Sequence, residues 1–143
     1  MLSVQQLSDR IEIQDLMTAY CRCIDTQDWD RYPSLFTENA RVDYTGTGGS
    51  SGSVQEILKW ISETFSMVSA CQHMVSNFEV ELGDDTASVR CLLHNPMIFG
   101  EGEDANTHFF GVWYVLVLER HDGRWLIKDM QQELGYSAGP LSS

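Results

Sequence analysis

The spacing of apolar residues changes near position 70, and this change constrains the fold of the chain more than any other feature. Before it, apolar side chains recur about every four residues, as on one face of a helix; after it, they alternate with polar ones. Helical segments followed by a run of strands are typical of an α+β domain, in which helices pack on one face of a mostly antiparallel sheet. The order of the two periods therefore predicts an α+β fold.

Two segments of the first half carry the signals of a helix start. Ser3-Val4-Gln5-Gln6 fits a capping box, and the apolar residues behind it predict a long helix that ends near Ile24. Ser53-Val54-Gln55-Glu56 repeats this pattern and predicts a helix through about Phe65. Between the two helices we expect three further elements. A short helical segment follows residues 26–28, a strand covers 40–44, and a flexible loop rich in glycine and serine covers 46–52.

The second half predicts four long strands, at about 71–82, 86–99, 107–119 and 124–133. The sequences Gly83-Asp84-Asp85 and His121-Asp122-Gly123 are typical of tight turns, so neighbouring strands are expected to run antiparallel. Strands this long must curl in a small domain, and a curled sheet closed by helices encloses a cone-shaped cavity. We expect the functional site in that cavity.

The composition fits one globular domain over residues 1–143, with 43% apolar and 21% charged residues. Nine Lys and Arg residues against 21 Asp and Glu residues give a formal charge of −12, which repels the phosphates of nucleic acids and anionic lipids. The longest apolar run, Val112 to Leu118, is too short to span a bilayer, and residues 1–6 lack the features of a secretory signal. We therefore expect a cytoplasmic protein without nucleic-acid or membrane partners.

The four cysteines are Cys21, Cys23, Cys71 and Cys91, a density far below that of a disulfide scaffold. They are interpreted as small buried hydrophobic residues. Cys21 and Cys23 would point about 200° apart on a helix, and no second pair or nearby histidine completes a four-ligand site. No metal and no cofactor are expected.

His73 and Asp25 are the candidate acid–base pair. Asp25 falls where the first helix ends, a position at which the helix dipole disfavours a carboxylate. If that helix crosses the concave face of the sheet, Asp25 can reach His73 and fix its tautomer, which would make the histidine a general base. The alternative is a core histidine bonded to a backbone carbonyl.

Alternation assigns the residues around His73 to two faces of the expected strand 71–82. One face carries His73 with small and polar neighbours, namely Cys71, Val75 and Asn77. The other face carries Met74, Phe78, Val80 and Leu82.

Several short motifs occur in a characteristic order along the chain. They are Ile13-Gln14-Asp15-Leu16, Tyr20-x-Arg22-x-x-Asp25, Asp28-Trp29-Asp30, Leu35-Phe36-Thr37, Val42-Asp43-Tyr44, Gln72-His73 and Asp122-Gly123-Arg124-Trp125. Together they resemble the SnoaL-like superfamily, with the nuclear-transport-factor-like cone, and within it the scytalone dehydratase-like branch. The resemblance implies an α+β cone, a homo-oligomer that is usually a trimer, and no metal or organic cofactor.

The same resemblance implies roles for four residues. Asp25 and His73 match the acid–base dyad of scytalone dehydratases, bile acid 7α-dehydratases and hexachlorocyclohexane dehydrochlorinases, all of which catalyse eliminations. Tyr20 matches a catalytic tyrosine of the bile acid dehydratases, whose Tyr-x-Arg-Cys-x-Asp run is similar to residues 20–25 here. Tyr44 matches a tyrosine that helps to polarise the substrate carbonyl through water in scytalone dehydratases.

Three positions depart from those enzymes. Scytalone dehydratases use a second histidine one strand later, where a gap-free register gives Met97 and leaves His94 on the opposite parity. Dehydrochlorinases have a lysine at the position of Tyr20 and an arginine at that of Asp129. The nearest active-site match is therefore the bile acid dehydratase.

These residues predict a lyase that eliminates water from a cyclic hydrophobic molecule such as a steroid, a polyketide or an aromatic catabolite. His73 would remove a proton from carbon, and Tyr20 or Tyr44 would stabilise the developing oxygen charge. Four aromatic residues are expected to wall the cavity, namely Trp29, Phe65, Phe109 and Trp113. The alternatives are an isomerase or polyketide cyclase with the same base, and a non-catalytic ligand carrier or partner subunit of an aromatic-ring dioxygenase.

The other histidines are weaker candidates. His121 is expected in a solvated turn, and whether His94 or His108 faces the cavity depends on a strand parity that the sequence does not fix.

Overall fold

Both predicted helix starts are confirmed. Helix α1 (Val4–Asp25) is capped by Ser3, whose hydroxyl accepts from the Gln6 N–H while the Gln6 side chain accepts from the Ser3 N–H. Helix α2 (Val54–Phe65) has the same reciprocal cap between Ser53 and Glu56. Each cap satisfies backbone donors that have no partner within the helix, which fixes where the chain enters it.

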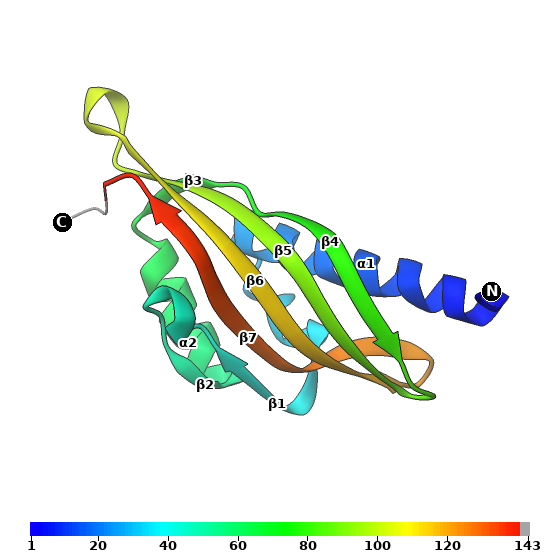
Figure 1. The fold of residues 1–143 in the computed structure, drawn as a ribbon. Coiled ribbons are helices and arrows are strands. Elements are labelled where there is room, and N and C mark those ends of the chain that lie inside the picture. The colour runs from blue at the N-terminus through cyan, green and yellow to red at the C-terminus, as the bar shows by residue number, and fades with distance from the viewer. Residues whose placement is uncertain (141–143) are drawn as a thin grey trace.

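In a computed structural model of the chain, which describes residues 1–140, these helices pack against a strongly curled, mostly antiparallel sheet (Figure 1). The architecture confirms the predicted α+β cone. The strands are β1 (Phe36–Asp43), β2 (Ser51–Ser53), β3 (Val68–Cys71), β4 (Met74–Leu82), β5 (Thr86–Phe99), β6 (Asn106–His121) and β7 (Arg124–Ala138). Short 3₁₀ turns cover Tyr32–Leu35, Thr45–Thr47 and Gly102–Asp104.

The seven-stranded sheet has the order β2-β1-β7-β6-β5-β3, and β4 also pairs with β5. The pairs are antiparallel except β1 with β7, which are parallel and join the first half of the chain to its end. The pairing of β6 with β7 shifts register after Gly111 and again after Val117. Such irregularities increase local twist, and here they help the long strands to curl around the helices.

Strand 86–99 was predicted with its exact bounds, whereas the predicted strand 71–82 was wrong in two respects. It is divided into β3 and β4, and His73 lies in the two-residue connection between them. Asn77 has a positive φ of 54°, and the register of β4 on β5 shifts between Ser76 and Glu79. This bulge moves the alternation by one residue.

The predicted faces of two residues are therefore reversed. Val75 packs against the core with Phe78, Val80 and Leu82, while Met74 is exposed. The short helical segment predicted after residues 26–28 is a single 3₁₀ turn, and the strand predicted over 40–44 begins earlier, at Phe36.

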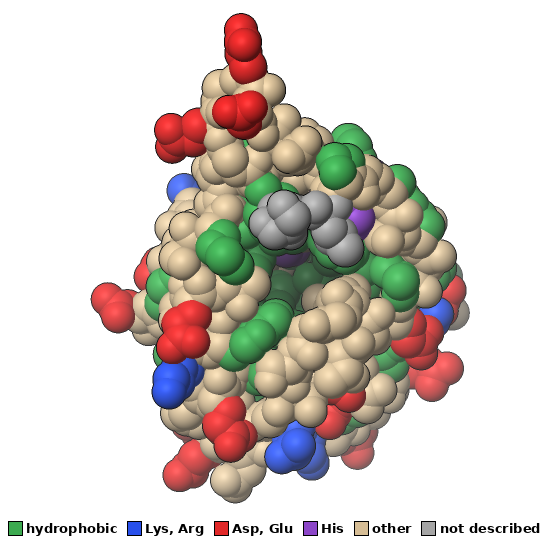
Figure 2. Space-filling model, turned by 90° about the vertical axis from the view of Figure 1, so that its left-hand side faces the viewer, with side chains coloured by type: hydrophobic (Ala, Val, Ile, Leu, Met, Phe, Trp, Pro, Cys, Tyr) green, Lys and Arg blue, Asp and Glu red, His purple; other side chains and the backbone are tan. Residues whose placement is uncertain are grey.

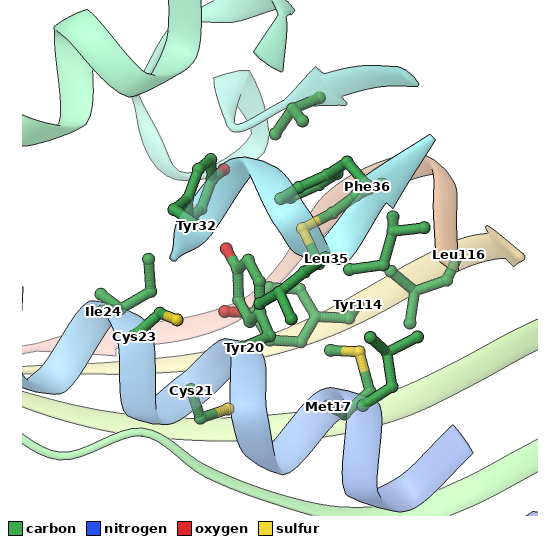
Figure 3. Packing of buried hydrophobic residues seen from close by; sticks show 14 of the residues in the cluster. Met17, Tyr20, Cys21, Cys23, Ile24, Tyr32, Leu35, Phe36, Tyr114 and Leu116 are labelled. Atoms are coloured by element: carbon green, nitrogen blue, oxygen red, sulfur yellow. The ribbon is translucent and has the colours of Figure 1, made fainter. Parts of the chain in front are cut away.

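The core lies between α1 and the concave face of the sheet. Figure 3 shows Met17 and Tyr20 of α1 packed with Tyr114 and Leu116 of β6, and all four are almost completely buried. Within residues 1–140 no helix has the length and apolar character needed to cross a membrane.

A buried ionic cluster fixes the first half of α1 to the hairpin between β6 and β7. The carboxylate of Asp9 accepts hydrogen bonds from Arg120 at 2.9 Å, from the Trp125 indole at 3.2 Å and from Gln5 at 3.0 Å. Burial alone would raise the pKa of Asp9, but the hydrogen bonds from Arg120, Gln5 and Trp125 outweigh it and lower the pKa.

Candidate active site

The structure brings together Asp25 and His73, which are far apart in the sequence. Asp25 is the last residue of α1, and its Oδ1 lies 2.6 Å from Nδ1 of His73. Both carboxylate oxygens also lie 3.1 Å from the backbone nitrogen of His73, and the Cys71 thiol donates to Oδ1 at 3.4 Å. The carboxylate therefore holds both the imidazole ring and the connection that carries it.

This geometry defines the tautomer of His73. An ionised carboxylate only accepts hydrogen bonds, so in the neutral histidine Nδ1 carries the proton and Nε2 is the basic nitrogen. The His73 side chain is 6% exposed, and its Nε2 has no hydrogen-bond partner among residues 1–140. Nε2 is not fully enclosed by protein atoms, so it retains some access to solvent or ligand.

An apolar cavity of about 210 Å³ opens beside this pair. Figure 2 shows the corresponding face as a hollow bordered mainly by hydrophobic side chains. Residues from α1, α2, β5 and β6, Gln132 of β7 and the loop after β1 line it. Its aromatic lining residues are Tyr20, Tyr44, Trp60, Phe65, Phe99 and Phe110.

The dyad lies at the edge of this cavity, and neither of its side chains forms part of the lining. Phe65 lines the cavity and stacks on the His73 ring with centroids 6.4 Å apart. Ile24, the residue before Asp25, also lines it. The Phe65 ring therefore borders both the cavity and the imidazole of His73.

Buried tyrosines form a hydrogen-bonded group at the same cavity. Tyr44 OH bonds to Tyr20 OH, to Tyr32 OH at 2.9 Å and to the Met130 sulfur at 3.8 Å. Burial and the neighbouring tyrosines raise the pKa of Tyr20 and of Tyr44 well above the ordinary value. The two phenols that line the cavity are therefore neutral hydrogen-bond donors and cannot serve as bases.

Comparison with known proteins places the chain in a family. The model of the SnoaL-like domain matches residues 5–131. The chain is a SnoaL-like protein. An uncharacterised Mycobacterium tuberculosis protein, Rv2910c, is 40% identical over 114 residues, which cover 80% of this chain and 77% of that protein.

Solved structures agree with this assignment. A protein from Novosphingobium aromaticivorans, provisionally assigned as an aromatic ring hydroxylase, is 28% identical with a TM-score of 0.84, covering 94% of both chains. A hexachlorocyclohexane dehydrochlorinase is 18% identical with a TM-score of 0.80, covering 96% of this chain and 92% of its own. Similar folds also include scytalone dehydratase-like and nuclear-transport-factor-like proteins, which confirms the resemblance found in the sequence.

Of the four predicted cavity walls in this SnoaL-like protein, two lie on the concave side. Phe65 lines the cavity directly. Trp29 stands behind it, with its ring edge-on to Phe65 at 5.9 Å and to Tyr32 at 6.4 Å. Trp29 therefore supports the wall and does not form it.

The prediction that Phe109 and Trp113 wall the cavity is wrong. Phe109 is 37% exposed on the outer face of β6, and Trp113, also on that face, lies beneath the Arg90 guanidinium at 4.5 Å. Their neighbours Phe110 and Val112 line the cavity instead. The error is one of strand parity: β6 has large apolar residues on both faces, so alternation alone does not show which set is inside.

The sequence interpretation missed Asn95, which lines the cavity from β5 and is 5% exposed. Its alternation with the buried residues Leu93 and Met97 was the signal that could have shown that Asn95 faces inward. Met97, which stands where scytalone dehydratases have a second histidine, lines the cavity as well. The sequence interpretation also gave no role to Tyr32, whose hydroxyl bonds to that of Tyr44.

Neither His94 nor His108 lines the cavity. His94 faces outward, and its Nδ1 is hydrogen-bonded to Tyr136 OH at 2.8 Å. His108 is buried, and its Nδ1 donates to the Gly139 carbonyl at 2.9 Å. His121 ends β6 and is exposed, as expected.

Asp25, Cys71 and His73 form the one group of possible metal ligands among residues 1–140, with ligand atoms within 4.8 Å of one another. The group suits a metal poorly. Nδ1 of His73 and the carboxylate already bond to each other, and burial and the Asp25 charge raise the pKa of Cys71 to about 12. A metal would have to displace both the thiol proton of Cys71 and the Nδ1 proton that bonds to Asp25.

Proposed function

We propose that this SnoaL-like protein is a cofactor-independent lyase that eliminates water from a small cyclic, hydrophobic molecule. The observation that carries the proposal is the 2.6 Å contact between Asp25 and Nδ1 of His73, which leaves Nε2 as an unpaired base beside an apolar cavity. The SnoaL-like fold, with solved relatives that include a dehydrochlorinase, supports a small-molecule-processing enzyme.

The residues can perform the elimination in two proton transfers. Nε2 of His73 takes a proton from the carbon next to a carbonyl, and Asp25 stabilises the imidazolium that forms. The electrons move to the carbonyl oxygen, where Tyr20 or Tyr44 donates a hydrogen bond to the enolate. When the enolate collapses, the neighbouring hydroxyl leaves with the proton held by His73, and the products are an alkene and one water.

The cavity limits the size of the ring system. An apolar cavity of about 150 Å³ accommodates benzene, so the 210 Å³ found here suits one or two rings. A four-ring steroid would have to extend through the mouth. Among the substrate classes considered, an aromatic catabolite or a small polyketide therefore fits better than a steroid.

One observation favours a second function, that of a non-catalytic carrier or partner subunit. Neither dyad side chain lines the cavity, so a ligand can be bound without touching the dyad. Catalysis requires the ligand to reach Nε2 of His73 at the edge of the cavity. In the carrier function the ligand would not reach Nε2, and the dyad would serve only to hold the connection between β3 and β4.

Incubation with cyclic β-hydroxy ketones, beginning with 3-hydroxy-1-indanone, tests the proposal. Mass spectrometry detects loss of water, and absorbance detects the conjugated product. The wild type should dehydrate at least one compound, while His73→Gln and Asp25→Asn should be slower by about 10²–10⁴-fold. His94→Gln, a histidine on the outer face, is the matched control and should retain the rate.

The outcomes separate the candidate functions. A product of unchanged mass would indicate an isomerase or cyclase with the same base. Binding without turnover in the wild type would favour the carrier. Turnover that survives both dyad substitutions would contradict the proposal.

A further inference from the structure

Asn95 is a buried polar side chain without a partner. It is 5% exposed, its Oδ1 is fully enclosed, and no hydrogen bond joins its side chain to any other group within residues 1–140. Buried polar groups in folded proteins are almost always hydrogen-bonded, so an exception of this kind requires an explanation. Asn95 lines the cavity and its amide nitrogen is not among the enclosed atoms, so a ligand in the cavity can bond to the amide.

The strand register places Asn95 opposite His73. Cys71 pairs with Met97 and Met74 pairs with His94, so β3 and β4 keep one register along β5. Between them, the Gln72 N–H donates to the Pro96 carbonyl at 3.2 Å. Counting along this shared register places His73 across from Asn95.

The chemistry of the amide indicates what it can recognise. Its NH₂ donates to a carbonyl oxygen and its oxygen accepts from a hydroxyl, whichever way the amide is turned. The amide has no useful basicity, so it can orient a substrate but cannot remove its proton. The surrounding lining is largely apolar, which leaves Asn95 as the polar group of the β5 wall.

We propose that Asn95 is a specificity-determining residue that binds the oxygen-bearing group of a ring ketone or ring alcohol and positions the adjacent carbon beside His73. That the adjacent carbon reacts with His73 rests on the proposed function. That Asn95 binds the oxygen-bearing group does not depend on turnover. It predicts selection of oxygenated rings over hydrocarbons of the same shape.

Binding of 1-indanone, 1-indanol and indane to the intact chain tests this selection. Calorimetry on the wild type should show that the ketone and the alcohol bind roughly ten- to a hundredfold more tightly than indane, since an unmet buried hydrogen bond costs about that factor. Asn95→Leu, which keeps the volume and removes the polar atoms, should reduce the ratio to about one. His94→Leu makes the same change at the adjacent outward position and should keep the wild-type ratio.

A second measurement does not depend on the stability of a variant. In the wild type, 1-indanone should shift the side-chain NH₂ resonances of Asn95, whereas indane should not. An equal ketone-to-indane ratio in wild type and Asn95→Leu, unshifted resonances, or no binding of any of the three probes would overturn the proposal. A selective protein that dehydrates nothing would refute the elimination and leave the role of Asn95 intact.

Discussion

Asp25, the last residue of α1, accepts hydrogen bonds from both the ring and the backbone of His73, 48 positions later in the chain. A carboxylate at a helix C-terminus is electrostatically disfavoured, so its presence there depends on these tertiary partners. The contact fixes one end of the helix to the connection between β3 and β4 and determines which ring nitrogen carries the proton.

Substitution of Asp25 by Asn should change the tautomer of His73. In the wild type at neutral pH, the contact predicts a proton on Nδ1 and a bare Nε2. An amide can donate as well as accept, so Asp25→Asn should increase the population with the proton on Nε2. Long-range ¹H–¹⁵N spectra of the imidazole report both states, and an identical tautomer in the two proteins would contradict the orienting role of Asp25.

Four of the five tyrosines should remain protonated in alkaline solution until the fold is lost. Burial raises the pKa of Tyr20, Tyr32, Tyr44 and Tyr114 above the ordinary value. A folded-state pKa raised above the unfolded value stabilises the fold fully below about pH 10, and this contribution is lost as the pH rises further. Tyrosinate absorbance and near-ultraviolet circular dichroism, recorded together, should therefore change in one transition. Ionisation of these four residues with the fold intact would show that the hydroxyls are accessible to water.

The Asp9 cluster should make the protein sensitive to acid. The folded-state pKa of Asp9 is lowered, so its contribution to stability is present above the unfolded value of about 3.9 and is lost as the pH falls below it. Asp9→Asn should reduce the free energy of unfolding by about 2–3 kcal/mol, because it leaves Arg120 partly buried without its main partner. Urea unfolding at neutral pH measures this loss.

Asp85→Asn is the matched control for that substitution. Asp85 contacts the same arginine at 3.5 Å, but its side chain is 78% exposed. Its removal should change the stability by less than about 0.5 kcal/mol, as is usual for exposed ion pairs. Equal losses in the two variants would contradict the structural role assigned to Asp9.

Local signals in the sequence were enough to predict much of the fold. The two capping boxes predicted the helix starts, and alternation together with turn residues predicted both ends of β5. The bulge at Asn77 was not predicted: asparagine adopts a positive φ more readily than most residues, but this tendency alone does not show that a strand is interrupted there. The parallel pairing of β1 with β7 is likewise a property of the whole fold.

The candidate site could be predicted only in part. The unfavourable placement of a carboxylate at a helix end, together with the family resemblance, pointed to Asp25 and His73. Phe109 was chosen over Phe110 because adjacent aromatic residues in a strand leave parity undetermined. The unpaired amide of Asn95 was not visible in the sequence, since the absence of a hydrogen bond becomes evident only when all neighbours have been placed.

Exchange of the carbon-bound protons next to the carbonyl of 1-indanone, followed by proton NMR in deuterium oxide, tests the central claim most directly. It reports removal of a proton from carbon and needs no knowledge of the natural substrate. The wild type should accelerate the exchange, His73→Gln should lose at least about a hundredfold of that acceleration, and His94→Gln should retain it. Equal exchange rates with wild type and His73→Gln would contradict the assignment of His73 as the base.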